Sequence, residues 1–325
     1  MNNAFCLVPI FSLILAGVAA AAPLKGEEIN NAPINTVSTD RLANSRSKFD
    51  PAIVHLQVLL DRAGSSPGVI DGRNGENLGM AIAGFEIAQQ LPVDGKLDPD
   101  VIGRLPDDAP AIQSYVILED DGKDLVERIP KDYAEQAKMR HLGYTSITEK
   151  LAERFHMDIN LFKALNPDTP VAVGETVFVA MPGASRSGEV KRIEAHKKSG
   201  QVMAFAEDGT LLAAYPATIG SEESPSPTGT HKVKGVARMP PYTYNPKINF
   251  QQGKNRKILK LPSGPNNPVG TVWIDLTEPT YGIHGTPSPE LIGKASSHGC
   301  VRLTNWDVEE LAGMVKPGVT VEFFD

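Results

Sequence analysis

A change of hydrophobic pattern near Val190 divides this sequence into two parts with different secondary structure. Upstream, apolar residues such as Leu56, Leu59 and Leu60 recur at helical spacing, which predicts amphipathic helices. Downstream, short apolar runs alternate with Gly, Pro and Asn, which predicts strands joined by tight turns. A chain of 325 residues is long enough for two or three domains. We therefore expect a multidomain α+β protein whose C-terminal domain, residues 190–325, is mainly β and sandwich-like.

Charge and cysteine content exclude several classes of protein. Lys and Arg total 32 against 39 Asp and Glu, so the formal net charge is −7 and no basic block stands out. A nucleic-acid partner is therefore not expected. Two cysteines, Cys6 and Cys300, cannot make a disulfide framework.

The N-terminal residues 1–22 predict a secretory signal peptide. An apolar run ends in four alanines before Pro23, which fits a cleavage site at small residues, and an uncleaved membrane anchor is the alternative. Cleavage would remove Cys6 and leave Cys300 as the single thiol of an exported chain. In an oxidising compartment such a thiol is buried, paired between chains or used chemically. The polar residues 23–47 predict a linker.

Two small modules are expected between this linker and Val190. Residues 48–108 carry three helical patterns: one around Leu56, one over 76–90, and a short one that begins with Asp98 as N-cap before Pro99. Residues 114–183 carry two amphipathic helices and a final strand, and a first strand is expected near 114–118. An insertion of about 25 residues separates that first strand from the helices.

Local signals also place elements within the C-terminal part. Asp208-Gly209 between two apolar runs predicts a hairpin turn. Residues 305–314 carry the one clear helical pattern there, with Val308, Leu311 and Met314 in phase.

The segment between Tyr281 and Asn305 carries the candidate chemistry. Cys300 follows Ser297, His298 and Gly299, and His284 lies upstream at the end of an apolar strand. A thiol attacks as its thiolate, so a base must lie within hydrogen-bond reach. His298 is on the same side as Cys300 in an extended chain, and His284 can face the thiol from a neighbouring strand. These residues predict a cysteine nucleophile with a histidine base.

Two other interpretations of these three side chains remain open. Cys300 could be buried and inert beside two incidental histidines. A zinc site of His284, His298 and Cys300 fits by ligand type, but it lacks an obvious fourth ligand and a Cys-x-x-Cys pair. We expect neither a metal nor a cofactor.

The C-terminal residues 190–325 resemble the L,D-transpeptidase (YkuD-type) catalytic domain. The resemblance is carried by His284-Gly285-Thr286, then Ser297-His298-Gly299-Cys300-Val301-Arg302, and Asn305. Residues 48–108 resemble the three-helix peptidoglycan-binding fold through two Asp-Gly loops, with Phe85-Glu86 where Phe-Gln is usual. Residues 114–183 are similar to a LysM module apart from the insertion.

The resemblance implies acyl transfer on peptidoglycan in the periplasm or cell wall. Cys300 would attack the carbonyl of the third residue of a tetrapeptide stem and expel D-alanine. The amine of another stem would then take the acyl group, giving a cross-link between third residues. A lysine of an outer-membrane lipoprotein and water are alternative acceptors, and water would make the protein an L,D-carboxypeptidase. A non-catalytic protein that binds wall glycan is the alternative outside the enzymes. Reaction with carbapenems is also implied.

Chemistry and resemblance together predict the roles of the motif residues. His284 would be the general base, with the carbonyl of Gly285 orienting its ring in place of a carboxylate. His298 would shape the pocket and hydrogen-bond substrate. Backbone N–H groups of Gly299 and Cys300 would form an oxyanion hole.

The remaining candidates have more than one expected role. Arg302 would bind a stem carboxylate or form a salt bridge that holds the loop. Ser297 would hydrogen-bond within the loop. Tyr242, Tyr244 and Trp273 would line the groove or pack in the core.

Overall fold

The computed structural model describes residues 24–37, 49–248, 250–295, 297 and 299–325. The expected signal peptide, Cys6 and His298 lie outside these residues. Within the described ranges, no helix is long and apolar enough to cross a membrane.

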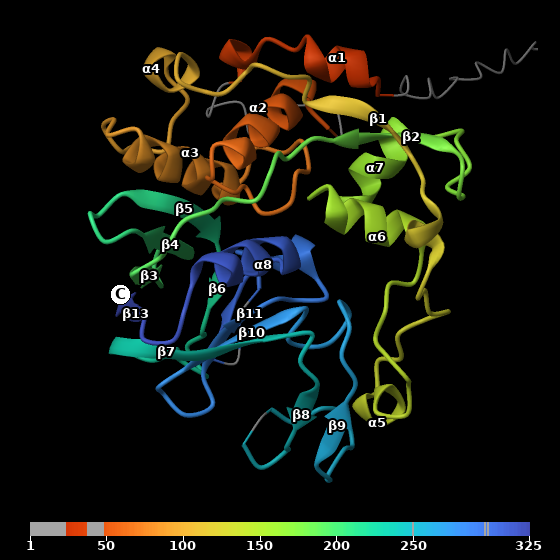
Figure 1. Ribbon diagram of the computed structural model, residues 1–325, viewed down its shortest axis with the longest axis vertical. Coiled ribbons are helices and arrows are strands. Elements are labelled where there is room, and N and C mark those ends of the chain that lie inside the picture. Colours follow the sequence, from red (N-terminus) through yellow and green to blue (C-terminus); the bar gives the residue numbers. More distant parts are fainter. Residues whose placement is uncertain (1–23, 38–48, 249, 296, 298) are drawn as a thin grey trace, which may run out of the picture.

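The C-terminal domain is built on nine strands in the hydrogen-bonded order β5-β4-β3-β13-β7-β10-β11-β12-β6 (Figure 1). Strand β7 joins two halves, because residues 229–232 pair with β13 and residues 233–238 pair with β10. The strands are β3 (Arg192–His196), β4 (Gln201–Phe205), β5 (Leu211–Pro216), β6 (Thr218–Ile219), β7 (Gly229–Arg238), β10 (Val272–Leu276), β11 (Gly282–His284), β12 (Val301–Arg302) and β13 (Thr320–Phe324).

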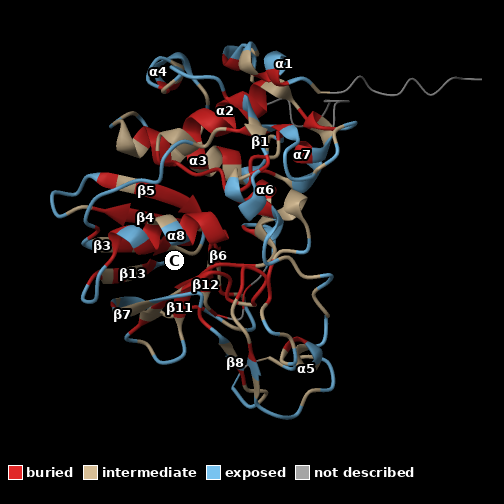
Figure 2. Ribbon diagram, turned by 45° about the vertical axis from the view of Figure 1, so that its right-hand side comes forward, coloured by how far each residue is buried: buried red, intermediate tan, exposed pale blue. Residues whose placement is uncertain are grey.

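One apolar core holds the two halves of this sheet and helix α8 (Asn305–Met314) together. Val308 and Leu311 of α8 are fully buried with Ile193 and Ile274 from the two halves. Figure 2 shows buried residues gathered where α8 meets the strands. The helix matches the predicted range, and the expected mainly β, sandwich-like domain is confirmed.

The β4–β5 hairpin also forms as expected. Its turn contains Asp208 and Gly209, and Gly209 adopts a φ of +84°, a conformation that glycine tolerates best.

The first module contains three helices, α2 (Pro51–Arg62), α3 (Glu76–Ala88) and α4 (Pro99–Ile102). One buried side chain holds each Asp-Gly loop. Gln57 Oε1 accepts from the N–H of Gly72 at 2.8 Å, and Glu86 Oε2 accepts from the N–H of Gly95 at 2.9 Å. Glu86 thus binds the loop through its carboxylate, and the three-helix module is confirmed.

This module covers the edge of the large sheet at β5. The N–H of Ser66 donates to the carbonyl of Ala214, and the N–H of Ala214 donates to the carbonyl of Gly64, both at 2.9 Å. Helix α3 approaches so closely that a Cβ on Gly84 would lie 2.7 Å from the Cβ of Ala214. At Ala214, the backbone N–H and carbonyl of this edge strand are thereby satisfied within the chain.

The second module pairs β1 (Ile112–Val116) with β2 (Thr176–Ala180) in antiparallel fashion and packs α6 (Ile147–Arg154) and α7 (Ile159–Leu165) against them. Its core is continuous with the first module, because Val54 and Val58 of α2 are buried in the same cluster as Leu151 and Leu161. The two modules therefore form one packed body.

The predicted linker over 23–47 is wrong for the part that the structure describes. Residues 24–37 contain α1 (Gly26–Asn30) and the 3-10 helix η1 (Ile34–Thr36). Ile29 is fully buried in the core of the second module. The Asn30 side chain accepts from the N–H of Ile112 at 2.7 Å and donates to its carbonyl at 2.9 Å. This contact replaces a sheet partner for β1, so the polar segment is part of the fold.

The insertion segment, residues 119–145, leaves the second module and packs on the catalytic domain (Figure 1). It contains η3 (Glu119–Gly122) and α5 (Tyr133–Gln136), and it contacts the hairpin of β8 (Tyr242–Tyr244) and β9 (Leu259–Leu261). Leu142 is fully buried in one cluster with Tyr244 and Leu261. Its N–H donates to the carbonyl of Ser263 at 2.9 Å.

A substitution at Gly264 would measure how much stability the contact between Leu142 and the catalytic domain contributes. The φ of Gly264 is +149°, and a Cβ there would lie 2.1 Å from the carbonyl oxygen of Leu142. We expect Gly264→Ala to lower the free energy of unfolding by about 1–3 kcal/mol, measured by denaturant titration. Gly253→Ala is the control, because Gly253 also has a positive φ but no atom near its Cβ position. Equal losses in both variants would show that the contact with Leu142 contributes nothing.

A cavity of about 370 Å³ lies where the two modules meet α8. His156 Nδ1 lies 2.9 Å from Asp61 Oδ2, and the His156 ring stacks on Trp306 at 5.0 Å. Burial raises the pKa of Glu153 to about 8 and that of Asp307 to about 8. The folded protein therefore holds both carboxyl groups largely protonated at neutral pH.

These carboxyl groups predict a protein that loses stability as the pH rises. The pKa of Glu153 is about 8 in the folded protein, against an ordinary value of 4.5, so the folded state binds this proton more tightly than the unfolded state does. The stability that Glu153 contributes is therefore complete below about pH 4.5 and is lost as the pH approaches 8. Glu153→Gln should flatten this slope and raise the melting temperature at pH 8 by roughly 2–4 °C. Glu207→Gln, at an exposed turn, should keep the full slope. An unchanged slope in Glu153→Gln would contradict the assignment.

Candidate active site

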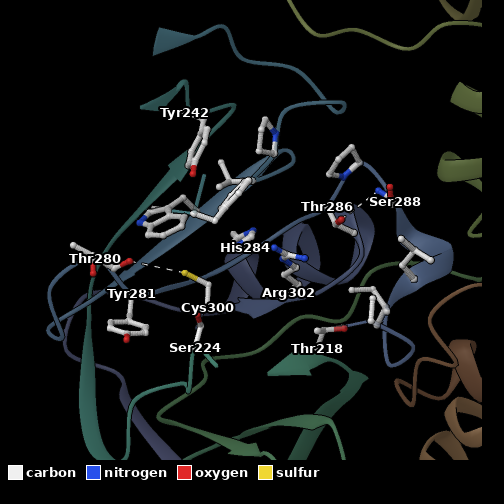
Figure 3. Close-up of a pocket in the computed structure, with 18 of the residues that line it drawn as sticks. Thr218, Ser224, Tyr242, Thr280, Tyr281, His284, Thr286, Ser288, Cys300 and Arg302 are labelled. Atoms are coloured by element: carbon white, nitrogen blue, oxygen red, sulfur yellow. Dashed lines mark hydrogen bonds between the residues drawn. The ribbon is translucent and has the colours of Figure 1, made fainter. Parts of the chain in front are cut away.

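Parallel pairing of β11 with β12 positions the reactive side chains. Ile283 lies opposite Val301, and His284 lies opposite Arg302. Cys300, just before β12, therefore lies beside the strand that carries His284. Figure 3 shows the Cys300 thiol, the His284 ring and the Arg302 guanidinium together at one cavity.

That cavity has a volume of about 440 Å³ and is rich in aromatic side chains. Its polar groups include Cys300, His284 and Arg302. Its aromatic lining consists of Tyr133, Tyr242, Phe250, Trp273 and Tyr281. The size suits a short peptide segment with one or two side chains.

The His284 ring is held in one orientation. Its Nδ1 lies 2.7 Å from the carbonyl oxygen of Gly285, which accepts the Nδ1–H, and the ring stacks on Trp273 at 5.4 Å. The tautomer that this bond requires leaves Nε2 to accept a proton. Burial lowers the pKa of His284 to about 4, so the ring is neutral at neutral pH. The geometry expected for Gly285 is present.

Cys300 is a free, half-buried thiol. Its Sγ lies 3.9 Å from the carbonyl oxygen of Thr280, to which the S–H donates (Figure 3). Burial raises the pKa of the Cys300 thiol above its ordinary value. The resting site therefore combines a neutral thiol with a neutral imidazole.

Asn305 supports the backbone that orients His284. Its Oδ1 accepts from the N–H of Thr271 at 3.2 Å, and a Cβ on Gly285 would lie 2.3 Å from the same oxygen. Its Nδ2 donates to Glu153 Oε2 at 2.9 Å. Asn305 belongs to the sequence motif, but the motif does not predict this contact with the second module.

The loop before Cys300 is tightly folded. Gly299 has a φ of +104°, and a Cβ there would lie 2.8 Å from the Tyr281 ring. Ser297 Oγ donates to the carbonyl of Cys300 at 2.6 Å, so Ser297 hydrogen-bonds within the loop as expected. His298 lies outside the described residues, and the oxyanion role of Gly299 stays a prediction.

The other candidates divide between cavity and core. Arg302, Tyr242 and Trp273 line the cavity. Tyr244 is fully buried with Leu261, so it packs in a core. Tyr133 was missed because it is far away in the sequence and nothing near it predicts catalysis.

Across the described ranges, no three His, Cys, Asp or Glu side chains are grouped so that they could hold a metal ion. The zinc alternative includes His298 and so falls partly outside those ranges.

Comparison with known proteins identifies two of the domains. The family model of the L,D-transpeptidase catalytic domain (YkuD) matches residues 190–322, and a model of a peptidoglycan-binding domain matches residues 50–105. A protein of Bacillus licheniformis named L,D-transpeptidase YkuD is 30% identical over 151 residues, which are 46% of this chain and 75% of that protein. The Escherichia coli K12 protein named L,D-transpeptidase YbiS is 28% identical over 193 residues, which are 56% of this chain and 61% of that protein.

A solved L,D-transpeptidase of Xylanimonas cellulosilytica covers 86% of this chain and 97% of its own, with 18% identity and a TM-score of 0.37. That score is too low to define a shared arrangement of the domains. The 30% identity to the Bacillus licheniformis protein extends over 75% of that protein, and the family model matches the same domain. The chain therefore belongs to the YkuD family of L,D-transpeptidases.

The protonation states of the site predict how Cys300 reacts with iodoacetamide. Because burial raises the thiol pKa and His284 is neutral, the alkylation rate should still be rising at about pH 9. The rate is measured by mass spectrometry as a function of pH, with Cys300→Ala as the blank. A rate that is already maximal below about pH 7 would instead indicate a thiolate–imidazolium pair.

Proposed function

We propose that the protein is a peptidoglycan L,D-transpeptidase that uses Cys300 as its nucleophile and His284 as its base. The observation that carries this proposal is that both side chains line one cavity, His284 from β11 and Cys300 from the position just before the paired strand β12. The ring orientation set by Gly285 supports it, because it leaves Nε2 to receive the thiol proton.

The first half-reaction forms a thioester. His284 Nε2 takes the proton from Cys300 as the sulfur bonds to the carbonyl carbon of the third residue of a tetrapeptide stem. The C–N bond to D-alanine then breaks, and its amine leaves with the proton returned by His284. N–H groups of Gly299 and Cys300 would stabilise the oxyanion, at about 3–4 kcal/mol per donor.

The second half-reaction transfers the acyl group to an amine. The acceptor amine loses a proton to His284 as it attacks the thioester, the C–S bond breaks, and His284 returns that proton to the Cys300 sulfur, which leaves as a thiol. We propose the side-chain amine of another stem as acceptor, with a lipoprotein lysine and water as the alternatives. His298 and Arg302 would bind substrate, and the guanidinium of Arg302 suits a stem carboxylate.

The domains that surround the site support the same substrate and location. A peptidoglycan-binding domain and a domain of the L,D-transpeptidase family in one chain imply work on the wall outside the cytoplasm. We propose export through the signal peptide, residues 1–22, to the periplasm or cell wall, and glycan binding by the two N-terminal modules.

Mass spectrometry tests the covalent step. Incubation with a carbapenem should add the mass of the drug to the protein, and Cys300→Ala should lose this adduct completely. With a disaccharide-tetrapeptide as substrate, the unaltered protein should release D-alanine and form a cross-linked dimer, and Cys300→Ser should lose at least about a thousandfold in rate.

Arg302→Lys is the matched control, because it keeps the charge and both reacting groups and should retain measurable acylation. Retention of the adduct and of D-alanine release by Cys300→Ala would overturn the proposal. Release of D-alanine with tripeptide alone as the other product would reassign the acceptor to water.

A further inference from the structure

The insertion segment reaches the cavity that contains Cys300. Tyr133, the first residue of α5, lines it together with His284 and Arg302. The segment belongs by sequence to the second module, but α5 packs beside β9 at the catalytic domain (Figure 1). A side chain from a module outside the catalytic domain therefore forms part of the cavity wall.

Aromatic neighbours fix the Tyr133 ring. It packs edge-on against Tyr242 at 6.2 Å, Tyr244 at 5.4 Å and Phe250 at 6.1 Å. Edge-to-face pairs at these distances are favourable beyond the area that they bury. Two of these partners, Tyr242 and Phe250, line the cavity themselves, so one continuous aromatic wall is formed.

Hydrogen bonds tie the backbone around Tyr133 to the catalytic domain. Gln252 Nε2 donates to the carbonyl of Lys131 at 2.8 Å, and Gln252 Oε1 accepts from the N–H of Tyr133 at 3.3 Å. Asn255 Nδ2 donates to Asp132 Oδ1 at 2.8 Å, while Asp132 caps α5. The position of Tyr133 is thus set by the domain that carries the cavity.

The cavity combines two kinds of chemistry. Burial raises the pKa of Tyr133 to about 12, so its hydroxyl remains a neutral donor, and the charge of Arg302 acts on it in the opposite direction. Tyr133 and Arg302 both line this cavity, and a phenol donor together with a guanidinium complements a carboxylate. The aromatic wall offers apolar surface to an aliphatic chain.

We propose that Tyr133 is a specificity-determining residue, which binds with Arg302 a carboxylate on the aliphatic side chain of a stem-peptide substrate. This inference rests on the proposed function, because it names what one wall of that site recognises. The insertion then completes the substrate site instead of only spacing the modules.

Kinetics with two peptides test the role of the hydroxyl. Tyr133→Phe keeps the ring contacts and removes one donor. It should raise KM roughly 10-fold for a stem peptide whose diamino acid has a free side-chain carboxylate, with kcat almost unchanged. For the peptide with that carboxylate amidated, Tyr133→Phe and the unaltered protein should have the same KM. If the Tyr133 hydroxyl had a purely structural role, Tyr133→Phe would change KM equally for both peptides.

Tyr115→Phe is the matched control. Its hydroxyl lies in the same module but donates to Asp121 at 2.8 Å, and Tyr115 does not line the cavity. Its KM values should equal those of the unaltered protein for both peptides. Equal KM values for Tyr133→Phe and the unaltered protein with the free carboxylate would overturn the inference.

A binding measurement separates this inference from the proposed function. Calorimetry with Cys300→Ala, with and without Tyr133→Phe, measures affinity for the uncleaved peptide without turnover. If the unaltered protein releases no D-alanine, the proposed function fails, and a roughly 10-fold loss of affinity for the free carboxylate alone still supports the role of Tyr133. Equal affinities of the two variants would overturn that role whether or not turnover occurs.

Discussion

Parallel pairing between β11 and β12 is the constraint on which the site depends. Parallel neighbours cannot be joined by a tight turn, so the chain must make a long connection between His284 and Val301. Here that connection runs through the 3-10 helix η4 (Pro289–Leu291), and Thr286, Ser288 and Leu291 line the cavity. One topological requirement thus places the imidazole beside the thiol and builds part of the wall around them.

Burial then determines the protonation states of Cys300 and His284. It disfavours charge on each, so the resting pair is thiol and imidazole. A carboxylate beside His284 would favour the imidazolium, whereas the carbonyl of Gly285 is a dipole that orients the ring without a full charge. Arg302 adds a positive charge that favours the thiolate and opposes the imidazolium. Under the proposed mechanism, the thiolate would therefore form only as Cys300 attacks the substrate.

Elements whose determinants are local could be predicted from sequence. The α8 range follows from Thr304, whose Oγ1 accepts from the N–H of Asp307, and from an apolar stripe in phase. The β4–β5 turn follows from Asp208-Gly209. Residues 24–37 could not be predicted, because the cluster that buries Ile29 is completed by residues of the second module such as Ile112 and Val179. Tyr133 could not be predicted as a site residue for the same reason, since Gln252 and Asn255 determine where its helix lies.

The two N-terminal modules are joined to the catalytic domain by more than a tether. Gly64 and Ser66 hydrogen-bond to β5, and Glu153 reaches Asn305 beneath the backbone of Gly285. A flexible tether would raise only the local concentration of substrate. A fixed contact also sets the orientation of the two modules relative to Cys300. Because Tyr133 lines the cavity, loss of the second module would remove part of the wall around Cys300 and His284.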